Sequence, residues 1–165
     1  MNIRPESSGD FVAVRAILRE AFAGDDEADL VDRLRNDGDL LLSMVAEEAG
    51  QVVGHVAFSR LWLRHDGQRL PGVSLAPLSV MPGHRRHGIG AALVEAGHGR
   101  LRHAGESIIF VLGDPAYYGC FGYSIAAARA FDCVYAGPHF QALVLTSLAP
   151  KAGAITYAAS FDGLA

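Results

Sequence analysis

The chain has 165 residues, of which 50% are hydrophobic and 19% are charged, and its formal net charge is −4. This composition excludes intrinsic disorder, and the length suffices for one domain with a sizeable core, which we expect to span residues 1–165. The negative net charge argues against a nucleic-acid partner, because binding to phosphates usually requires a basic face, and it is compatible with a cationic amine substrate.

No apolar stretch is long enough to span a bilayer, and the first residues after Met1 lack the pattern of a signal peptide. We therefore expect no membrane association and a cytoplasmic location. The two cysteines, Cys120 and Cys133, are too few for a disulfide-stabilised scaffold.

Hydrophobic periodicity and turn residues predict an alternation of strands and helices along the whole chain. The predicted elements are, in order, a strand at 2–4, a helix through Val14 and Phe22, a helix from 25 to 36, strands at 41–46 and 52–63, a strand that ends at Val80, a helix at 88–104, a strand at 108–112, a short helix after Pro115, and C-terminal strands.

Pro77 falls within the predicted strand that ends at Val80. A proline has no N–H for the hydrogen-bond ladder, so it is confined to edge strands and bulges. The sequence therefore predicts an edge strand or a β-bulge at this point.

The stretch 75–90, LAPLSVMPGHRRHGIG, combines an apolar run, a basic turn and the start of a helix. The free N–H groups of a first helical turn and the helix dipole favour an anion there. Gly88 and Gly90 carry no Cβ atom that would keep a phosphate from the backbone, and Arg85 and Arg86 can form paired hydrogen bonds to phosphate oxygens. A glycine turn that serves only packing is the structural alternative.

Two other phosphate-binding motifs fit less well, so a nucleotide-binding domain is disfavoured. The chain has no G-x-x-x-x-G-K-[ST] sequence, and Leu93 stands where the dinucleotide fingerprint requires its third glycine or alanine.

A second motif, GDPAYYGCFGY at 113–123, follows the buried strand at 108–112. Asp114 and Pro115 are typical of a helix N-cap and first helical position, and Gly119 and Gly122 end the helix after little more than one turn. Tyr118 lies four residues before Gly122.

Together, the Arg-x-x-Gly-x-Gly turn and this tyrosine motif resemble the GNAT superfamily of N-acetyltransferases, in particular a bacterial group with an LGDPxYYxxFGF signature. The resemblance covers most of the chain and is strongest over 73–123. It implies an α/β (α+β) fold of the acyl-CoA N-acyltransferase type: a mixed, mostly antiparallel central sheet with helices on both faces and a bulged fourth strand splayed from the fifth. The pantetheine arm of acetyl-CoA would lie in that opening.

The resemblance also implies site residues. The expected acetyl-CoA contacts are Leu78, Ser79, Val80, Arg85, Arg86, His87, Gly88, Ile89, Gly90 and Ala91. Tyr118 is the expected general acid that protonates the departing CoA thiolate. Tyr117 points about 100° away around the helix, so only one of the two tyrosines can face the sulfur. Packing alone is the alternative for both.

Other candidates have simpler explanations. Asp114 is a cap more often than a base, and Cys120 is more often a small hydrophobic residue than a nucleophile of a two-step mechanism. His84 and His87 form an H-x-x-H pair without further ligands, so we expect no metal site.

The general base stays unassigned. Members of the superfamily often carry a glutamate on the fourth or fifth strand, but 73–80 and 107–112 contain no carboxylate. Glu47, Glu48 and His55 are replacements that the sequence does not rank. The acidic run of Asp25, Asp26, Glu27, Asp29 and Asp32 lies in the predicted helix pair that, as the resemblance implies, borders the acceptor site. It could attract a cationic amine there, although acidic residues in a first helical turn commonly complement the dipole.

The sequence thus predicts an acetyl-CoA-dependent N-acetyltransferase whose primary amine acceptor attacks directly in a ternary complex. The alternative is a non-catalytic acyl-CoA-binding sensor or regulatory module on the same fold. Whether the chain forms a homodimer stays open.

Overall fold

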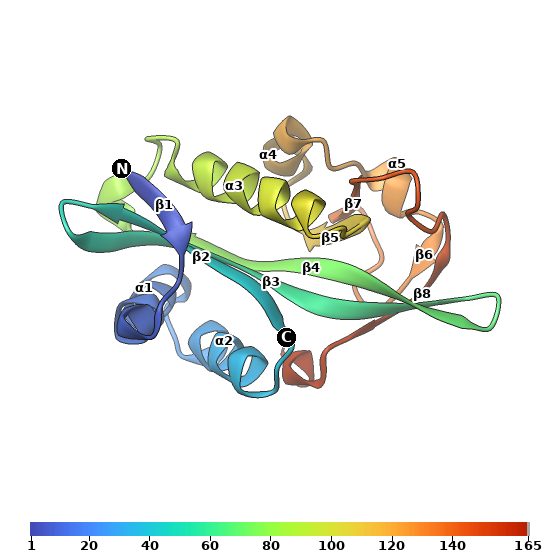
Figure 1. Ribbon diagram of the computed structural model, residues 1–165, viewed down its shortest axis with the longest axis horizontal. Helices are drawn as coiled ribbons and strands as arrows, with labels where there is room; N and C mark the ends of the chain where they lie inside the picture. Colours follow the sequence, from blue (N-terminus) through green and yellow to red (C-terminus); the bar gives the residue numbers. More distant parts are fainter. Residues whose placement is uncertain (165) are drawn as a thin grey trace.

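The computed structural model describes residues 1–164 as a twisted sheet with helices on both faces (Figure 1). The strands are β1 (Asn2–Pro5), β2 (Leu40–Glu48), β3 (Gln51–His65), β4 (Gln68–Val80), β5 (Ile108–Leu112), β6 (Phe131–Asp132), β7 (Phe140–Val144) and β8 (Gly153–Tyr157). The helices are α1 (Phe11–Phe22), α2 (Asp26–Asn36), α3 (Ile89–His103), α4 (Pro115–Tyr118) and α5 (Ile125–Ala128), with single 3-10 turns that include Pro82–His84 and Ala159–Phe161.

The strands lie in the order β1-β2-β3-β4-β5-β7, and β8 pairs with the far half of β3 and with β6. The pairs β4–β5 and β6–β8 are parallel, whereas the others are antiparallel. Figure 1 shows α3 on one face of the sheet and α1 and α2 on the other. This arrangement confirms the predicted fold class.

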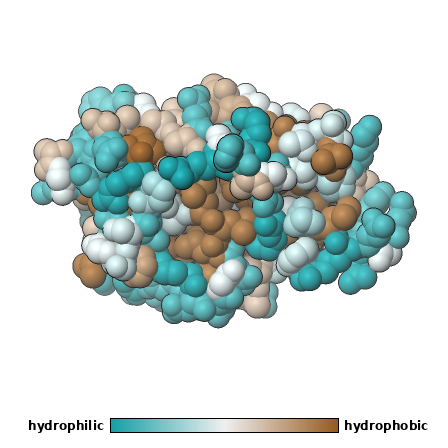
Figure 2. All heavy atoms as spheres, in the orientation of Figure 1, coloured by the Kyte–Doolittle hydropathy of each residue, from teal (hydrophilic) through white to brown (hydrophobic). Residues whose placement is uncertain are grey.

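Because the side chains of β3 alternate between the two faces of the sheet, this strand contributes residues to both core layers. Phe58 packs with Leu93 in the layer beneath α3, whereas its neighbour Ala57 packs with Val14 and Leu18 beneath α1. Successive strand residues point to opposite faces, so a strand buried on both sides must be apolar at nearly every position. On the face that Figure 2 shows, hydrophobic residues gather near the centre and hydrophilic ones surround them.

The strands β4 and β5 separate soon after they meet. They pair at only two positions, Val73 with Ile109 and Ser74 with Phe110, and β4 then continues to Val80 without pairing to β5. The edge of β4 beyond Ser74 therefore presents backbone groups that β5 does not pair.

A β-bulge lies just after this separation. Phe58 pairs with Leu75 and Val56 pairs with Leu78, so Ala76 and Pro77 together oppose one residue of β3. Because Pro77 lies in the bulge, its missing N–H does not interrupt the regular hydrogen-bond ladder between β3 and β4. The predicted bulge and splay are confirmed.

Two short elements differ from the prediction. The structure adds α5, one turn capped by the Ser124 hydroxyl, which accepts from the Ala127 N–H at 3.0 Å, and the two-residue strand β6. Neither is long enough to produce a periodic pattern in the sequence. The strands β2 and β3 also extend one or two residues beyond their predicted ranges.

Within residues 1–164, no helix has the length and apolar character needed to cross a membrane.

Candidate active site

The basic turn between β4 and α3 has an unusual backbone. Gly88 precedes α3 with φ +78°, and Arg86 also lies in the left-handed region at φ +65°. The Arg85 Nε–H donates to the Val80 carbonyl at 3.0 Å, which leaves the terminal guanidinium N–H groups for another partner. The free N–H groups at the start of α3 and the Arg85 guanidinium therefore lie on the same side of this loop.

A cavity of about 420 Å³, here called the turn cavity, opens at this side. It is lined by Ala21, Phe22, Leu78, Ser79, Val80, His84, Arg85, Arg86, Gly88, Ile89, Gly90, Ala91 and Tyr117. All predicted acetyl-CoA contacts except His87 are among these residues, and His87 is exposed outside the lining. Two arginines and the positive end of a helix make the cavity suitable for phosphate groups.

A second cavity, of about 320 Å³ and here called the aromatic cavity, lies at the splay of β4 and β5. It is lined by Phe22, Glu27, Leu30, Ser74, Leu75, Ala76, Pro77, Leu78, Leu112, Tyr118, Tyr135, Tyr157, Phe161 and Leu164. Phe22 and Leu78 line both cavities, so the two spaces adjoin along these side chains.

The tyrosine pair of α4 is divided between the cavities. The rings of Tyr117 and Tyr118 meet edge to face, with centroids 5.0 Å apart. Tyr117 lines the turn cavity, where its hydroxyl lies 2.7 Å from the position that a Cβ on Gly90 would occupy. Tyr118 lines the aromatic cavity, and burial, with a smaller effect of Tyr117, raises its pKa to about 12. Tyr118 is therefore protonated at neutral pH and able to donate.

A helix cap and an aromatic packing contact hold Tyr118 in place. The Asp114 carboxylate accepts from the Ala116 N–H at 2.9 Å, as a helix cap does. The ring of Tyr123 packs against Tyr118 with centroids 5.8 Å apart, and the Tyr123 hydroxyl is 2.7 Å from the Nε2 atom of His98 on α3. The observed role of Asp114 is the cap.

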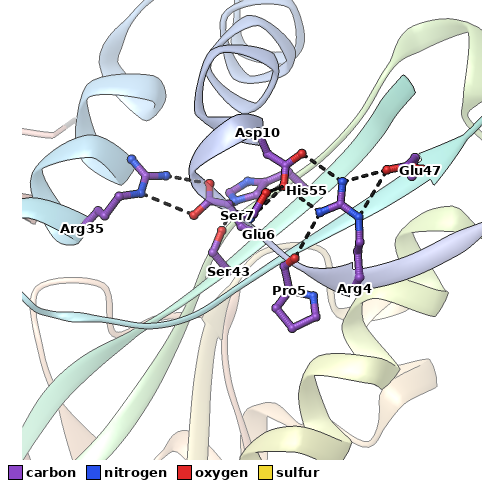
Figure 3. A network of polar contacts seen from close by, with 9 residues as sticks. All are labelled: Arg4, Pro5, Glu6, Ser7, Asp10, Arg35, Ser43, Glu47 and His55. Atoms are coloured by element: carbon purple, nitrogen blue, oxygen red, sulfur yellow. Dashed lines mark hydrogen bonds and ion pairs between the residues drawn. The ribbon is translucent and has the colours of Figure 1, made fainter. Parts of the chain in front are cut away.

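The three base candidates from the sequence are all engaged elsewhere. Glu47 accepts from Arg4 at 2.7 Å, and Glu48 is 3.1 Å from the Nδ1 atom of His84. His55 is fully buried, with its Nε2 atom 2.8 Å from the Ser43 hydroxyl (Figure 3), and burial lowers its pKa to about 3. Neither cavity has any of the three candidates among its described lining residues.

One carboxylate of the acidic run, which sequence reasoning considered only as a group, does line a cavity. Three aspartates of the acidic run form ion pairs with arginines at 2.7–2.8 Å: Asp25 with Arg19, Asp29 with Arg15, and Asp32 with Arg15 and Arg35. Glu27 instead lies in the aromatic cavity. Its spacing from Leu30, Val31 and Leu34 places it in phase with the buried stripe of α2, a signal that the sequence contains.

Of the remaining candidates, Cys120 and His87 lie outside both cavity linings, whereas His84 lines the turn cavity. Cys120 is exposed, with its Sγ atom 3.5 Å from the Ala116 carbonyl. His84 is engaged by Glu48, and His87 is exposed. Over residues 1–164, no three His, Cys, Asp or Glu side chains are grouped closely enough to bind a metal ion.

The mixed sheet with its splayed β4 and β5 is the fold of the acyl-CoA N-acyltransferases, and comparison with known proteins agrees. Residues 2–126 match the model of the acetyltransferase (GNAT) domain family. The N-acetyltransferase YhbS of Escherichia coli is 41% identical over 138 residues, which are 83% of this chain and 81% of the relative. A second E. coli protein, the N-acetyltransferase YjhQ, is 34% identical over 76% of this chain and 69% of its own length. The chain therefore belongs to the GNAT acetyltransferase family.

Two crystal structures resemble this fold closely. E. coli YhbS in complex with CoA superposes with a TM-score of 0.90 at 37% identity, covering 99% of this chain and 93% of that one. A GNAT acetyltransferase from Brucella melitensis in complex with acetyl-CoA gives a TM-score of 0.83 at 35% identity, covering 98% and 97%. The predicted family and enzyme class are confirmed, and the expected co-substrate agrees with the ligands of these two relatives. The acceptor, the individual site residues and the cytoplasmic location stay predictions.

Proposed function

We propose that this protein transfers the acetyl group of acetyl-CoA to a primary amine by direct attack. The observation that carries the proposal is the junction of two cavities of opposite character. The turn cavity has cationic groups suited to the CoA phosphates, and the aromatic cavity has a carboxylate suited to an amine. They share Phe22 and Leu78, so a thioester at this junction meets the amine directly.

The unpaired edge of β4 supports binding of the pantetheine arm and polarisation of the thioester. Beyond Ser74 its backbone groups are not paired with β5. In the proposed reaction, a backbone N–H in the segment 78–80 donates to the thioester oxygen as negative charge develops there. Because the bound reactants are already adjacent, proximity supplies much of the rate.

The proposed bond changes are as follows. The ammonium group of the acceptor first loses a proton to water, and the neutral amine nitrogen then attacks the thioester carbon, so that a C–N bond forms. The C–S bond then breaks while the Tyr118 hydroxyl transfers its proton to the sulfur, which leaves as the CoA thiol. The nitrogen loses one proton to water, and the Tyr118 phenolate regains a proton from water. No acetyl group is attached to the protein at any stage.

The test is to incubate the purified protein with acetyl-CoA and a panel of primary amines, to follow thiol release, and to identify the acetylated product by its mass. We expect thiol release that depends on the amine and matches the acetylated product in amount. Tight acetyl-CoA binding without turnover of any amine would favour the sensor instead. The lack of a carboxylate on β4 and β5 near the splay is the observation that favours that alternative.

A further inference from the structure

The walls of the aromatic cavity form a connected set of rings. Tyr157 meets Tyr135 edge to face with centroids 5.0 Å apart, and it meets Phe161 at 5.3 Å. Tyr118 completes the aromatic lining from α4. Burial raises the pKa of Tyr157 and of Tyr118, so these walls are uncharged at neutral pH. Such surfaces bind flat apolar groups through edge-to-face and stacked contacts.

Glu27 is the exception in this lining. Among the cavity's described lining residues it is the one carboxylate, and no lysine or arginine accompanies it. It is half-buried, and the hydrogen bonds and ion pairs found within residues 1–164 give it no partner. A carboxylate among apolar side chains has lost part of its hydration shell, and a bound cation compensates for that loss.

The position of Glu27 also fits an incoming amine. It lies in the first turn of α2, five residues after Phe22, which lines both cavities. An ammonium group bound at Glu27 would therefore lie in the cavity that Phe22 joins to the turn cavity. The body of the same ligand would lie among Tyr135, Tyr157 and Phe161.

We propose that the aromatic cavity binds a primary amine with a single positive charge on an aromatic body of one or two rings, and that Glu27 binds its ammonium group. This inference deepens the proposed function and rests on it. An apolar cavity of about 150 Å³ accepts benzene, so 320 Å³ suffices for such a body. A polycation is disfavoured, because its second charge would have no carboxylate within the cavity's described lining.

Binding is measured first without turnover, by calorimetric titration of 2-phenylethylamine into protein saturated with CoA. Glu27→Gln keeps the side-chain shape and removes the charge. Asp26→Asn is the matched control, because this exposed carboxylate lies one residue earlier on the same helix, outside the cavity lining. We expect wild type and Asp26→Asn to bind alike and Glu27→Gln to bind about ten- to one-hundred-fold more weakly. Binding of 2-phenylethanol, which lacks the ammonium group, should be equal in all three proteins.

Three outcomes would overturn the inference: no binding to the wild-type protein, equal amine affinity in Glu27→Gln, or the same loss in Asp26→Asn. A turnover assay adds a fourth, because a higher kcat/KM for spermidine than for 2-phenylethylamine would contradict the size and charge of the proposed acceptor. If 2-phenylethylamine binds through Glu27 and no amine of the panel is acetylated, the proposed enzyme function fails while the binding inference stands.

Discussion

Tyr117 and Tyr118 are consecutive residues of α4, yet their side chains line different cavities, with ring planes 88° apart. One short helix therefore contributes to both sides of the junction. Its start is set by the Asp114 cap, and it continues into a 3-10 turn that ends at Gly122, where φ is +97°. These local features decide which tyrosine faces which cavity, so the two residues should give different mutational phenotypes.

The contact between Tyr117 and Gly90 predicts a rescue. A Cβ on Gly90 would lie 2.7 Å from the Tyr117 hydroxyl oxygen but 3.9 Å from its ring carbon Cζ. Gly90→Ala should therefore displace Tyr117 and weaken acetyl-CoA binding several-fold, whereas the double variant with Tyr117→Phe should recover most of the affinity. Calorimetry on the four proteins of the double-mutant cycle checks this. Additive losses would show that the hydroxyl contact does not matter.

Gly88→Val should reduce acetyl-CoA affinity at least about ten-fold. The φ of +78° costs a residue with a side chain about 1–2 kcal/mol, and the turn would leave the conformation that presents its N–H groups. Gly83→Val is the control, because Gly83 has open space, an ordinary φ and no place in the cavity lining. The thermal midpoint of each variant shows whether it folds. Undiminished affinity in folded Gly88→Val would contradict the phosphate-binding role of the turn.

The burial of His98 predicts an acid-sensitive fold. Burial, with a smaller effect of Arg102, lowers the pKa of His98 from 6.5 to about 4. Between these values the unfolded chain binds the proton and the folded chain does not, so the free energy of unfolding falls as the pH falls, by up to about 1.4 kcal/mol per unit for this residue. His55 contributes in the same direction.

Urea unfolding between pH 7 and 4.5 measures this slope. His98→Gln removes the titrating ring and keeps a polar partner for Tyr123, so it should flatten the slope. His103→Gln, at an exposed position near the end of the same helix, should leave it unchanged. An unaltered slope in His98→Gln would mean that other groups cause the acid sensitivity.

Direct attack also makes a kinetic prediction. Initial rates measured against both substrates should give intersecting double-reciprocal lines, and Cys120→Ser should stay active, because Cys120 is exposed outside both cavity linings. Parallel lines, or a protein mass raised by one acetyl group after exposure to acetyl-CoA alone, would indicate a covalent route.

The basic turn and the tyrosine helix could be predicted because each is local in sequence. The turn needs only the residues between Val80 and Ala91, and the helix is marked by its cap and its closing glycines. The bulge was also predictable, since Pro77 within a strand allows few arrangements. The short elements α5 and β6 could not be recognised, because segments of four and two residues are too short to show a hydrophobic periodicity.

The aromatic cavity could not be predicted, because its walls come together only through the tertiary fold. Phe22 and Glu27 belong to the start of the chain, and Tyr135, Tyr157 and Phe161 to its end. Pairing of β8 with β3 brings the C-terminal segment beside the helix α2. No local pattern encodes that pairing. The phase of Glu27 on α2 could have indicated a carboxylate on the buried side, though not the cavity it lines.

The most direct test compares Tyr118→Phe with wild type in turnover and in acetyl-CoA affinity. The substitution keeps the ring that packs against Tyr117 and Tyr123 and removes only the hydroxyl that would protonate the thiolate. We predict that kcat falls by roughly ten- to a thousand-fold, about 1.4–4 kcal/mol of barrier, while the Kd for acetyl-CoA is nearly unchanged and Tyr117→Phe loses much less activity. Turnover of Tyr118→Phe at the wild-type rate from pH 6 to 9 would show that Tyr118 only packs in the site and would contradict its role as the general acid.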